Sequence, residues 1–162
     1  MKLPFKNPKP VVWAIVLFLC AFFYAVYSEA KEQTFLEIGG GVLSGEYSDS
    51  TAIAVTERFK GKYDLGFILI SDQTCYCSKG PSPMSSYFIT YAQRITTFKN
   101  WEFGIGLAHA SETNRVIGQE RMFTLSLYRN IGNWSIRWRH FSNAGTHERN
   151  TGQDVISVGY RF

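Results

Sequence analysis

Apolar and polar residues alternate one by one through most of the sequence after residue 33. Near the C-terminus, Trp134, Ile136 and Trp138 alternate with Ser135 and Arg137. A two-residue period sends successive side chains to opposite faces of a β-strand, so the pattern predicts strands, and no segment in this part has a convincing helical period. Eight stretches carry strand signals of this kind: Thr34–Ser44, Ser50–Phe59, Lys62–Ser71, Ser86–Thr97, Trp101–Ala110, Glu120–Arg129, Trp134–Asn143 and Asp154–Phe162.

One face of these predicted strands is large and apolar, and the other is small or polar. The apolar face includes Tyr87, Ile89, Tyr91, Trp101, Phe103, Ile105, Trp134 and Ile136, and the opposite face carries Arg94, Glu102, Arg137 and Arg139. Such charges would be poor fillers for the core of a soluble sandwich, but they can pair inside a polar lumen. The alternation therefore predicts an all-β fold, an eight-stranded antiparallel transmembrane β-barrel. Its apolar faces meet lipid, side chains fill its lumen, and closure satisfies every backbone group.

A basic start followed by a hydrophobic stretch opens the sequence. Three lysines precede an apolar run from Val11 to Val26, and Ser28-Glu29-Ala30 supplies a small-x-small end. This pattern predicts a secretory signal helix that is cleaved after Ala30. Residues 1–30 are then a signal peptide, and residues 31–162 form the barrel domain. The alternative is a retained membrane anchor, because the run is only slightly short for a spanning helix.

Cleavage would also change what the charge of the chain implies. The formal net charge of +4 falls to +2 when Lys2, Lys6, Lys9 and Glu29 leave. A mildly cationic surface suits anionic lipid headgroups, and no arginine-rich run indicates nucleic acid. We therefore expect a membrane partner and no nucleic-acid partner.

The end of the chain carries a second membrane signal. Ile156, Val158, Tyr160 and Phe162 stand at alternate positions, which resembles the C-terminal signature of bacterial outer-membrane barrels and implies location in the bacterial outer membrane. If both termini lie in the periplasm, short turns such as Lys60-Gly61 and Lys99-Asn100 lie there too. The longer connections, including residues 143–153, then lie outside the cell.

The stretch Trp138–Gly145 brings a base, a nucleophile and small residues together. His140 and Ser142 are two residues apart, so their side chains leave a strand on the same face. If the final turn centres near His147, His140 lies directly opposite Asp154 in an antiparallel pair. Side chains paired in this way come within hydrogen-bonding reach. The pattern predicts a Ser-His-Asp triad on the lipid-facing side, near the outer rim.

These residues resemble a known family. The run His140-Phe141-Ser142-Asn143-Ala144-Gly145, followed by an acid at Asp154, is similar to the PagL type of lipid A 3-O-deacylases. The resemblance implies a serine esterase without metal or cofactor that removes the ester-linked acyl chain at position 3 of lipid A, in lipopolysaccharide.

The resemblance also implies a role for each residue at the site. It makes Ser142 the nucleophile and His140 the base, with Asn143 and the Gly145 backbone N–H stabilising the oxyanion. Asp154 departs from the family pattern, which has Glu at this place, and Glu148 is the alternative acid.

Other readings of the sequence stay open. A non-catalytic small outer-membrane barrel with an adhesive or protective role is the main alternative function. Cys75 and Cys77 fall in the long polar connection Asp72–Ser85, as free thiols or a loop tie, and no histidine near them completes a metal site. The sequence leaves open whether the barrel forms a homodimer and which acyl length it prefers.

Overall fold

The computed structural model describes residues 33–42, 50–71, 73–77, 80–84, 86–113, 117–146 and 152–162. The predicted signal peptide, the proposed turn centre His147 and the alternative acid Glu148 lie outside the described residues. None of the described residues forms a helix long and apolar enough to cross a membrane.

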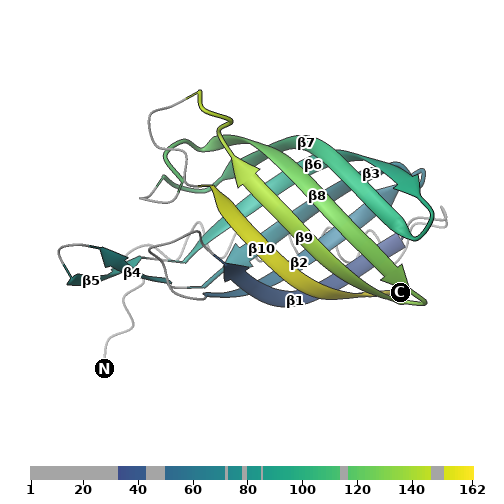
Figure 1. The fold of residues 1–162 in the computed structure, drawn as a ribbon, viewed down its shortest axis with the longest axis horizontal. Helices are drawn as coiled ribbons and strands as arrows, with labels where there is room; N and C mark the ends of the chain where they lie inside the picture. Colours follow the sequence, from purple (N-terminus) through teal and green to yellow (C-terminus); the bar gives the residue numbers. More distant parts are fainter. Residues whose placement is uncertain are drawn as a thin grey trace. The chain divides into compact units, whose positions relative to one another are not determined.

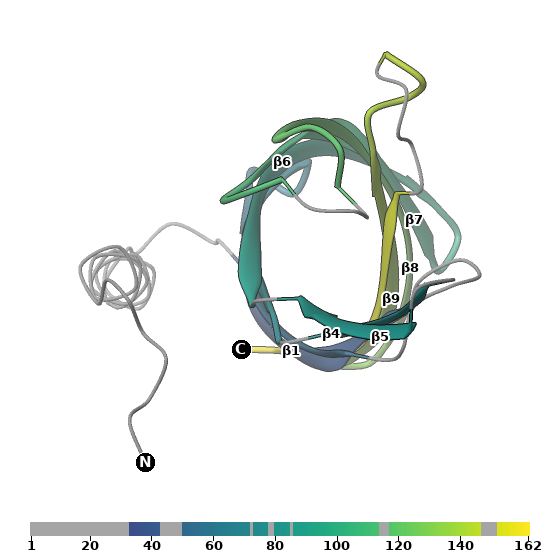
Figure 2. The ribbon, with the colours of Figure 1, turned by 90° about the vertical axis from the view of Figure 1, so that its left-hand side faces the viewer.

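Eight antiparallel strands close into a barrel, as the alternation predicted (Figures 1 and 2). Their order around the barrel is β1-β10-β9-β8-β7-β6-β3-β2, so β1 closes the ring by pairing with β10. The barrel strands are β1 (Gln33–Val42), β2 (Ser50–Phe59), β3 (Tyr63–Ile70), β6 (Tyr87–Phe98), β7 (Trp101–Ala110), β8 (Arg121–Ile131), β9 (Trp134–Ser142) and β10 (Gln153–Arg161). Each of the eight predicted strands is present, with bounds shifted by at most two residues.

The connection predicted as a loop between β3 and β6 contains a further hairpin. Here β4 (Gln73–Cys77) pairs with β5 (Gly80–Met84) in a separate two-stranded ribbon that extends beyond one end of the barrel (Figure 1). β5 contains two prolines, which are rare inside a sheet because proline cannot donate to a ladder. Each strand of a two-stranded ribbon has a free edge, however, where proline is tolerated. Cys75 and Cys77 therefore lie on a strand rather than in a loop.

The two ends of the barrel differ in their connections. Tight connections at 60–62, 99–100 and 132–133 lie at one end, which we call the turn end. Longer connections lie at the opposite end, which we call the loop end, and the ribbon β4-β5 belongs to one of them. At the turn end, Lys60 and Gly61 both have positive φ and Lys62 N donates to Phe59 O at 3.0 Å, as in the type I′ turns that suit hairpins.

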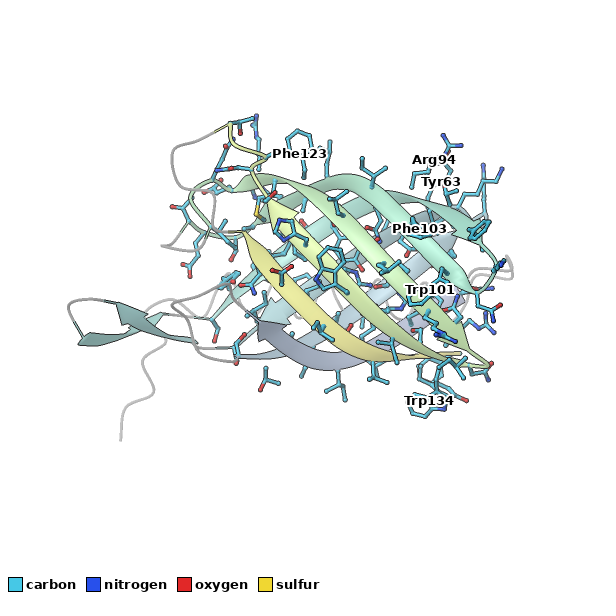
Figure 3. The ribbon with its side chains drawn as sticks, in the orientation of Figure 1. Tyr63, Arg94, Trp101, Phe103, Phe123 and Trp134 are labelled. Carbon is cyan, nitrogen blue, oxygen red and sulfur yellow. The ribbon has the colours of Figure 1, made fainter. Side chains whose placement is uncertain are left out.

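The outer surface of the barrel is a broad apolar belt. It exposes Leu36, Ile38, Ile53, Leu65, Leu69, Phe98, Phe103, Ile105, Leu107, Phe123, Leu125, Ile136, Ile156 and Val158. Trp101, Trp134 and Tyr63 lie toward the turn end, and Phe123 lies toward the loop end (Figure 3). A belt of this size would be unstable in water, whereas lipid satisfies it. The predicted orientation of the apolar face toward lipid is thus confirmed for most strands.

The lumen is filled, and its two halves differ in chemistry. The half near the loop end is an apolar cluster that includes Ala52, Ala54, Ile68, Ile70, Tyr87, Ile89, Ala108, Met122, Phe141 and Val155. The half near the turn end holds charges: among the described residues, the buried ionic side chains are Arg58, Arg137, Arg139, Glu37, Asp64 and Glu102. Three guanidinium groups thus face three carboxylates, and their formal charges cancel.

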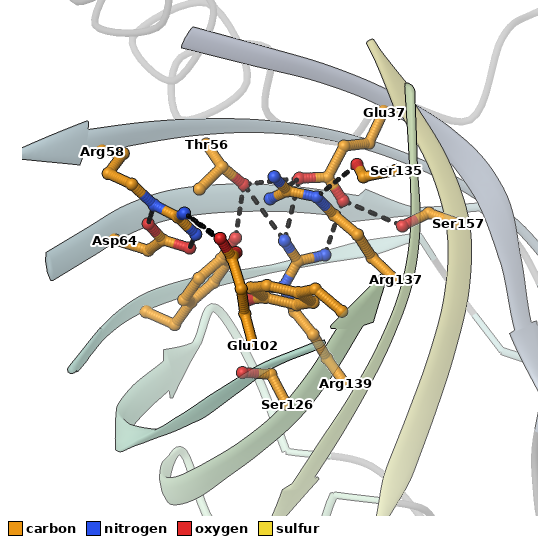
Figure 4. A network of polar contacts seen from close by, with 12 residues as sticks. Glu37, Thr56, Arg58, Asp64, Glu102, Ser126, Ser135, Arg137, Arg139 and Ser157 are labelled. Atoms are coloured by element: carbon orange, nitrogen blue, oxygen red, sulfur yellow. Dashed lines mark hydrogen bonds and ion pairs between the residues drawn. The ribbon is translucent and has the colours of Figure 1, made fainter. Parts of the chain in front are cut away.

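Glu37 is the centre of the charged half (Figure 4). Its carboxylate accepts two hydrogen bonds from Arg139, at 2.6 and 2.8 Å, and one from Arg137 at 3.1 Å. Thr56 and Ser157 donate to it at 2.6 and 2.8 Å. A buried charge is tolerated only when it is paired and hydrogen-bonded in this way. This network confirms that Arg137 and Arg139 face the lumen.

A second ion-pair cluster lies in the same half of the lumen. Arg58 donates one hydrogen bond to each carboxylate oxygen of Asp64, at 2.7 and 3.1 Å. The same guanidinium group donates to Glu102 at 2.9 Å. The predicted position of Glu102 inside the barrel is confirmed.

The prediction was wrong for β6, whose two faces are reversed. Tyr87, Ile89 and Tyr91 are buried in the lumen, while Arg94 is exposed on the outer face. The reason is that tyrosine is both apolar and polar. The Tyr91 hydroxyl lies 2.5 Å from Thr56 Oγ1, and the Tyr87 hydroxyl bonds Gln153. Arg94 lies near Tyr63 toward the turn end (Figure 3), so it can reach the headgroup region rather than a buried partner.

Candidate active site

The candidate site is built by the hairpin of β9 and β10, at the loop end of the barrel. His140 pairs directly with Asp154 in the ladder, as the symmetry of the hairpin predicted. Phe141, which follows His140, and Gln153, which precedes Asp154, are both buried in the lumen. Because side chains alternate along a strand, His140 and Asp154 both leave the outer face, next to the lipid-facing belt.

The two paired side chains form a hydrogen bond. His140 Nδ1 lies 3.0 Å from Asp154 Oδ1, and the two side chains are 27% and 25% exposed. A carboxylate that accepts from Nδ1–H leaves Nε2 free to act as a base. The pair therefore has the geometry of the acid and base of a serine hydrolase, at a surface that is partly covered rather than fully wet.

A tryptophan completes the surroundings of the acid. Trp138 Nε1 donates to the same oxygen, Asp154 Oδ1, at 3.0 Å. Its ring also stacks on the His140 ring, with centroids 6.1 Å apart and planes inclined by 21°. The sequence interpretation treated Trp138 as apolar surface alone, although its place two residues from His140 put it on the same face.

Gly152 provides the space into which the His140 ring extends. A Cβ atom at this glycine would lie 2.6 Å from His140 Cε1 and 3.1 Å from Nε2, and the backbone φ of +69° also favours glycine. Gly152 directly precedes β10, whose pairing with β9 begins at the Gln153–Phe141 pair. The ring edge that carries Cε1 and Nε2 thus lies against the backbone of Gly152.

Ser142 is the last residue of β9 and shares the outer face with His140. It is partly exposed, and its partner on β8 is Phe123. The Ala144 backbone N–H approaches Ser142 Oγ at 3.4 Å. The hairpin therefore brings base and acid into contact, and it places the serine two residues along the same face without a hydrogen bond to His140.

The residues after Ser142 form a tight turn. Ala144 and Gly145 have φ values of +51° and +78°, and Thr146 N donates to Asn143 O at 3.0 Å. Asn143 is buried, and its side-chain oxygen accepts the Gly145 N–H at 3.0 Å. Asn143 and Gly145, which we expected at the oxyanion, follow Ser142 closely in the chain, but the Asn143 side chain is buried and the Gly145 N–H is bonded to it.

Apolar side chains surround the site on the outer surface. Phe123, Leu125 and Ile156 are each 47% exposed. They pair across the ladders with Ser142, His140 and Trp138 respectively. An extended hydrocarbon chain could lie on this surface without an enclosed pocket, while its polar end reaches the serine.

The fold and the surface define the class of protein. The closed barrel, its apolar outer belt and its paired polar lumen are those of a small β-barrel protein of the bacterial outer membrane.

Comparison with known proteins gives similarities of fold. The chain is similar to the crystal structure of the outer membrane enzyme PagL, with 16% sequence identity, a TM-score of 0.45, and coverage of 80% of this chain and 98% of that one. It is also similar to Ail, the attachment invasion locus protein of Yersinia pestis, in complex with the heparin analogue sucrose octasulfate. For Ail the identity is 12% and the TM-score 0.41, with coverage of 81% and 96%. No protein-family model and no curated protein sequence matches the chain.

Proposed function

We propose that the chain is a carboxylic ester hydrolase that removes the ester-linked acyl chain at position 3 of lipid A in the outer leaflet. The observation that carries this proposal is the 3.0 Å contact between His140 and Asp154 on the outer face, beside Ser142 and within the apolar belt. A paired base and acid have no evident structural role there, because the barrel is already closed and its lumen is internally paired.

The triad would work in two steps. Ser142 Oγ attacks the ester carbonyl carbon while His140 Nε2 takes the serine proton. The protonated imidazole, held by Asp154, then gives that proton to the leaving sugar oxygen, so that the C–O bond breaks and an acyl-serine forms. Water attacks the acyl-serine in the second step, His140 accepts one of its protons and returns it to Ser142, and the fatty acid is released.

The oxyanion donors are Asn143 and the Gly145 backbone N–H. In the proposed reaction, substrate binding turns the Gly145 N–H from Asn143 Oδ1 toward the developing negative charge. One such donor contributes about 3 to 4 kcal/mol of transition-state stabilisation in a serine hydrolase. Ala144 and Gly145, which follow Ser142 closely in the chain, both have positive φ, so the backbone of this turn has a left-handed conformation.

The substrate class follows from the position of the site and from the resemblance of residues 140–145 to lipid A 3-O-deacylases. We place the loop end outside the cell, since the longer connections lie there. An ester of the outer leaflet would then reach Ser142 from the side, with its acyl chain against Phe123, Leu125 and Ile156.

Mass spectrometry of lipid A tests the proposal. Bacteria that express the wild-type protein should lose one 3-hydroxyacyl chain from their lipid A, and bacteria that express Ser142→Ala should keep it. Thr90→Ala, on the exposed face of β6, controls for expression and should behave as the wild type. The proposal is contradicted if the 3-hydroxyacyl chain is lost in both strains, wild type and Ser142→Ala, or if it is lost in neither.

The alternative is a non-catalytic outer-membrane barrel with an adhesive or protective role. The bond between the Gly145 N–H and Asn143 favours it, because this donor is already used. Purified protein in detergent distinguishes the two: an esterase activity that depends on Ser142 supports the enzyme, and adhesion that is unchanged in Ser142→Ala supports the alternative.

A further inference from the structure

Trp138 contacts both the acid and the base of the site, from a position two residues before His140 on the same face of β9. Its indole N–H donates to Asp154 Oδ1 at 3.0 Å, and the same oxygen accepts from His140 Nδ1 at 3.0 Å. Its ring lies nearly parallel to the imidazole. Two donors from one strand therefore converge on one oxygen of the neighbouring strand.

The short side chain of Asp154 explains why a second hydrogen-bond donor would matter. Aspartate is one methylene shorter than glutamate, so its carboxylate lies close to its own backbone and has few ways to reach across the ladder. A second donor on the same oxygen reduces the rotations that remain open to the carboxylate. Such a restraint matters because a displacement of about 1 Å at a catalytic group can cost 100-fold in rate.

We propose that Trp138 is a positioning residue of the esterase, which holds Asp154 in the orientation that orients His140. The inference rests on the proposed function. Trp138 does not touch the reacting ester in this role; it acts through the acid, and its ring keeps the imidazole plane fixed. The contribution of the indole is thus a hydrogen bond, beyond the apolar surface that any large side chain would supply.

The alternative role for Trp138 is contact with the acyl chain. Its side chain is partly exposed beside Ile156, on the surface where the chain would lie. The two roles differ in what they change. Loss of an acyl-chain contact raises KM, whereas loss of the acid's orientation lowers kcat and leaves KM nearly unchanged.

Trp138→Phe separates them, because phenylalanine keeps an aromatic ring and removes the N–H. We expect kcat for a detergent-solubilised lipid A substrate to fall by about 10- to 100-fold with KM within about twofold. Trp134→Phe is the matched control, since Trp134 lies on the same face of β9 and packs edge-on against Tyr160 near the turn end. It should leave both constants unchanged.

A longer acid should make the indole unnecessary. In the Asp154→Glu background, the extra methylene brings the carboxylate toward His140 without help, so Trp138→Phe should change kcat by less than about threefold. An equal loss of kcat in both backgrounds overturns the inference, as does a rise in KM with kcat unchanged. An inactive Asp154→Glu variant also overturns it, because the longer acid should still reach the imidazole.

The outcomes also distinguish this inference from the proposed function. If the wild-type protein has no Ser142-dependent esterase activity, the proposed function fails and Trp138 has no reaction to support. If the wild type is active and Trp138→Phe matches it, the proposed function stands and the positioning role is wrong.

Discussion

Strand β9 supplies partners to two carboxylates on opposite faces of the barrel wall. On the inner face, Glu37 accepts five hydrogen bonds, from Arg137, Arg139, Thr56 and Ser157, and is fully buried. On the outer face, Asp154 accepts from His140 and Trp138, through one oxygen, and is one-quarter exposed. The inner carboxylate is locked by permanent charges, whereas the outer one faces a base that can gain and lose a proton. The same strand thus separates a stabilising pair from the pair that we propose is catalytic.

The largest difference should appear in activity. His140→Ala removes the base and should lower kcat/KM of the esterase by at least about 10³-fold. The folded fraction should stay the same, because His140 lies outside the lumen. Hydrolysis assays and heat-dependent gel migration of the same preparations measure the two effects. An active variant would show that the outer pair is not catalytic.

The next effect is on stability. Glu37→Gln leaves two guanidinium groups in the lumen without their carboxylate, and loss of one partner from a buried ion pair costs about 3–5 kcal/mol. Asp154→Asn, at the partly exposed pair, should cost less than about 1 kcal/mol. Urea unfolding of the barrel in lipid vesicles measures the free energy of unfolding for both. Equal losses of unfolding free energy in the two variants would mean that the inner and outer carboxylates contribute equally to stability.

A smaller effect should follow from filling the space at Gly152. The new methyl of Gly152→Ala would lie 2.6 Å from His140 Cε1, so the imidazole must turn away from Asp154 or from Ser142. We expect kcat to fall by about 10- to 100-fold. Gly61→Ala is a control for backbone strain, since this turn-end glycine also has positive φ but nothing within 4 Å of its Cβ position. A similar loss of activity in both variants would contradict the steric argument.

The smallest effect concerns the arginine whose face was predicted wrongly. Arg94 is exposed on the outer face, so Arg94→Gln should change the free energy of unfolding by less than about 0.5 kcal/mol. Arg137→Gln, in the lumen, should cost several times more. The same vesicle unfolding experiment compares them. A large loss at Arg94 would place it in the charged network instead.

The sequence was sufficient to predict the barrel and the pairing at the site. Alternation predicts which residues share a face, and the assumption of a turn centred near His147 then sets His140 opposite Asp154, as the ladder shows. It was not sufficient for β6, because Tyr87 and Tyr91 look apolar in a pattern but carry hydroxyl groups that bond inside the lumen. The ribbon β4-β5 was not predicted for a similar reason: its prolines indicate a loop unless the strand has a free edge.

Contacts between side chains lay further beyond the reach of the sequence. A two-residue period places Trp138 and His140 on one face, but it cannot show that the indole N–H turns toward Asp154. Gly152 gave no signal, because its importance comes from the ring that occupies the space beside it. Glu37 gave little more, since it lies a hundred residues from the arginines that it holds.

The balanced interior described above has a consequence for the membrane that carries this protein. Paired charges occupy one half of the lumen and mostly apolar side chains occupy the other, so we expect ions and small solutes to find no open route through the barrel. A planar bilayer loaded with the purified protein should remain electrically silent. On this expectation, insertion of the protein would leave the permeability of the membrane unchanged.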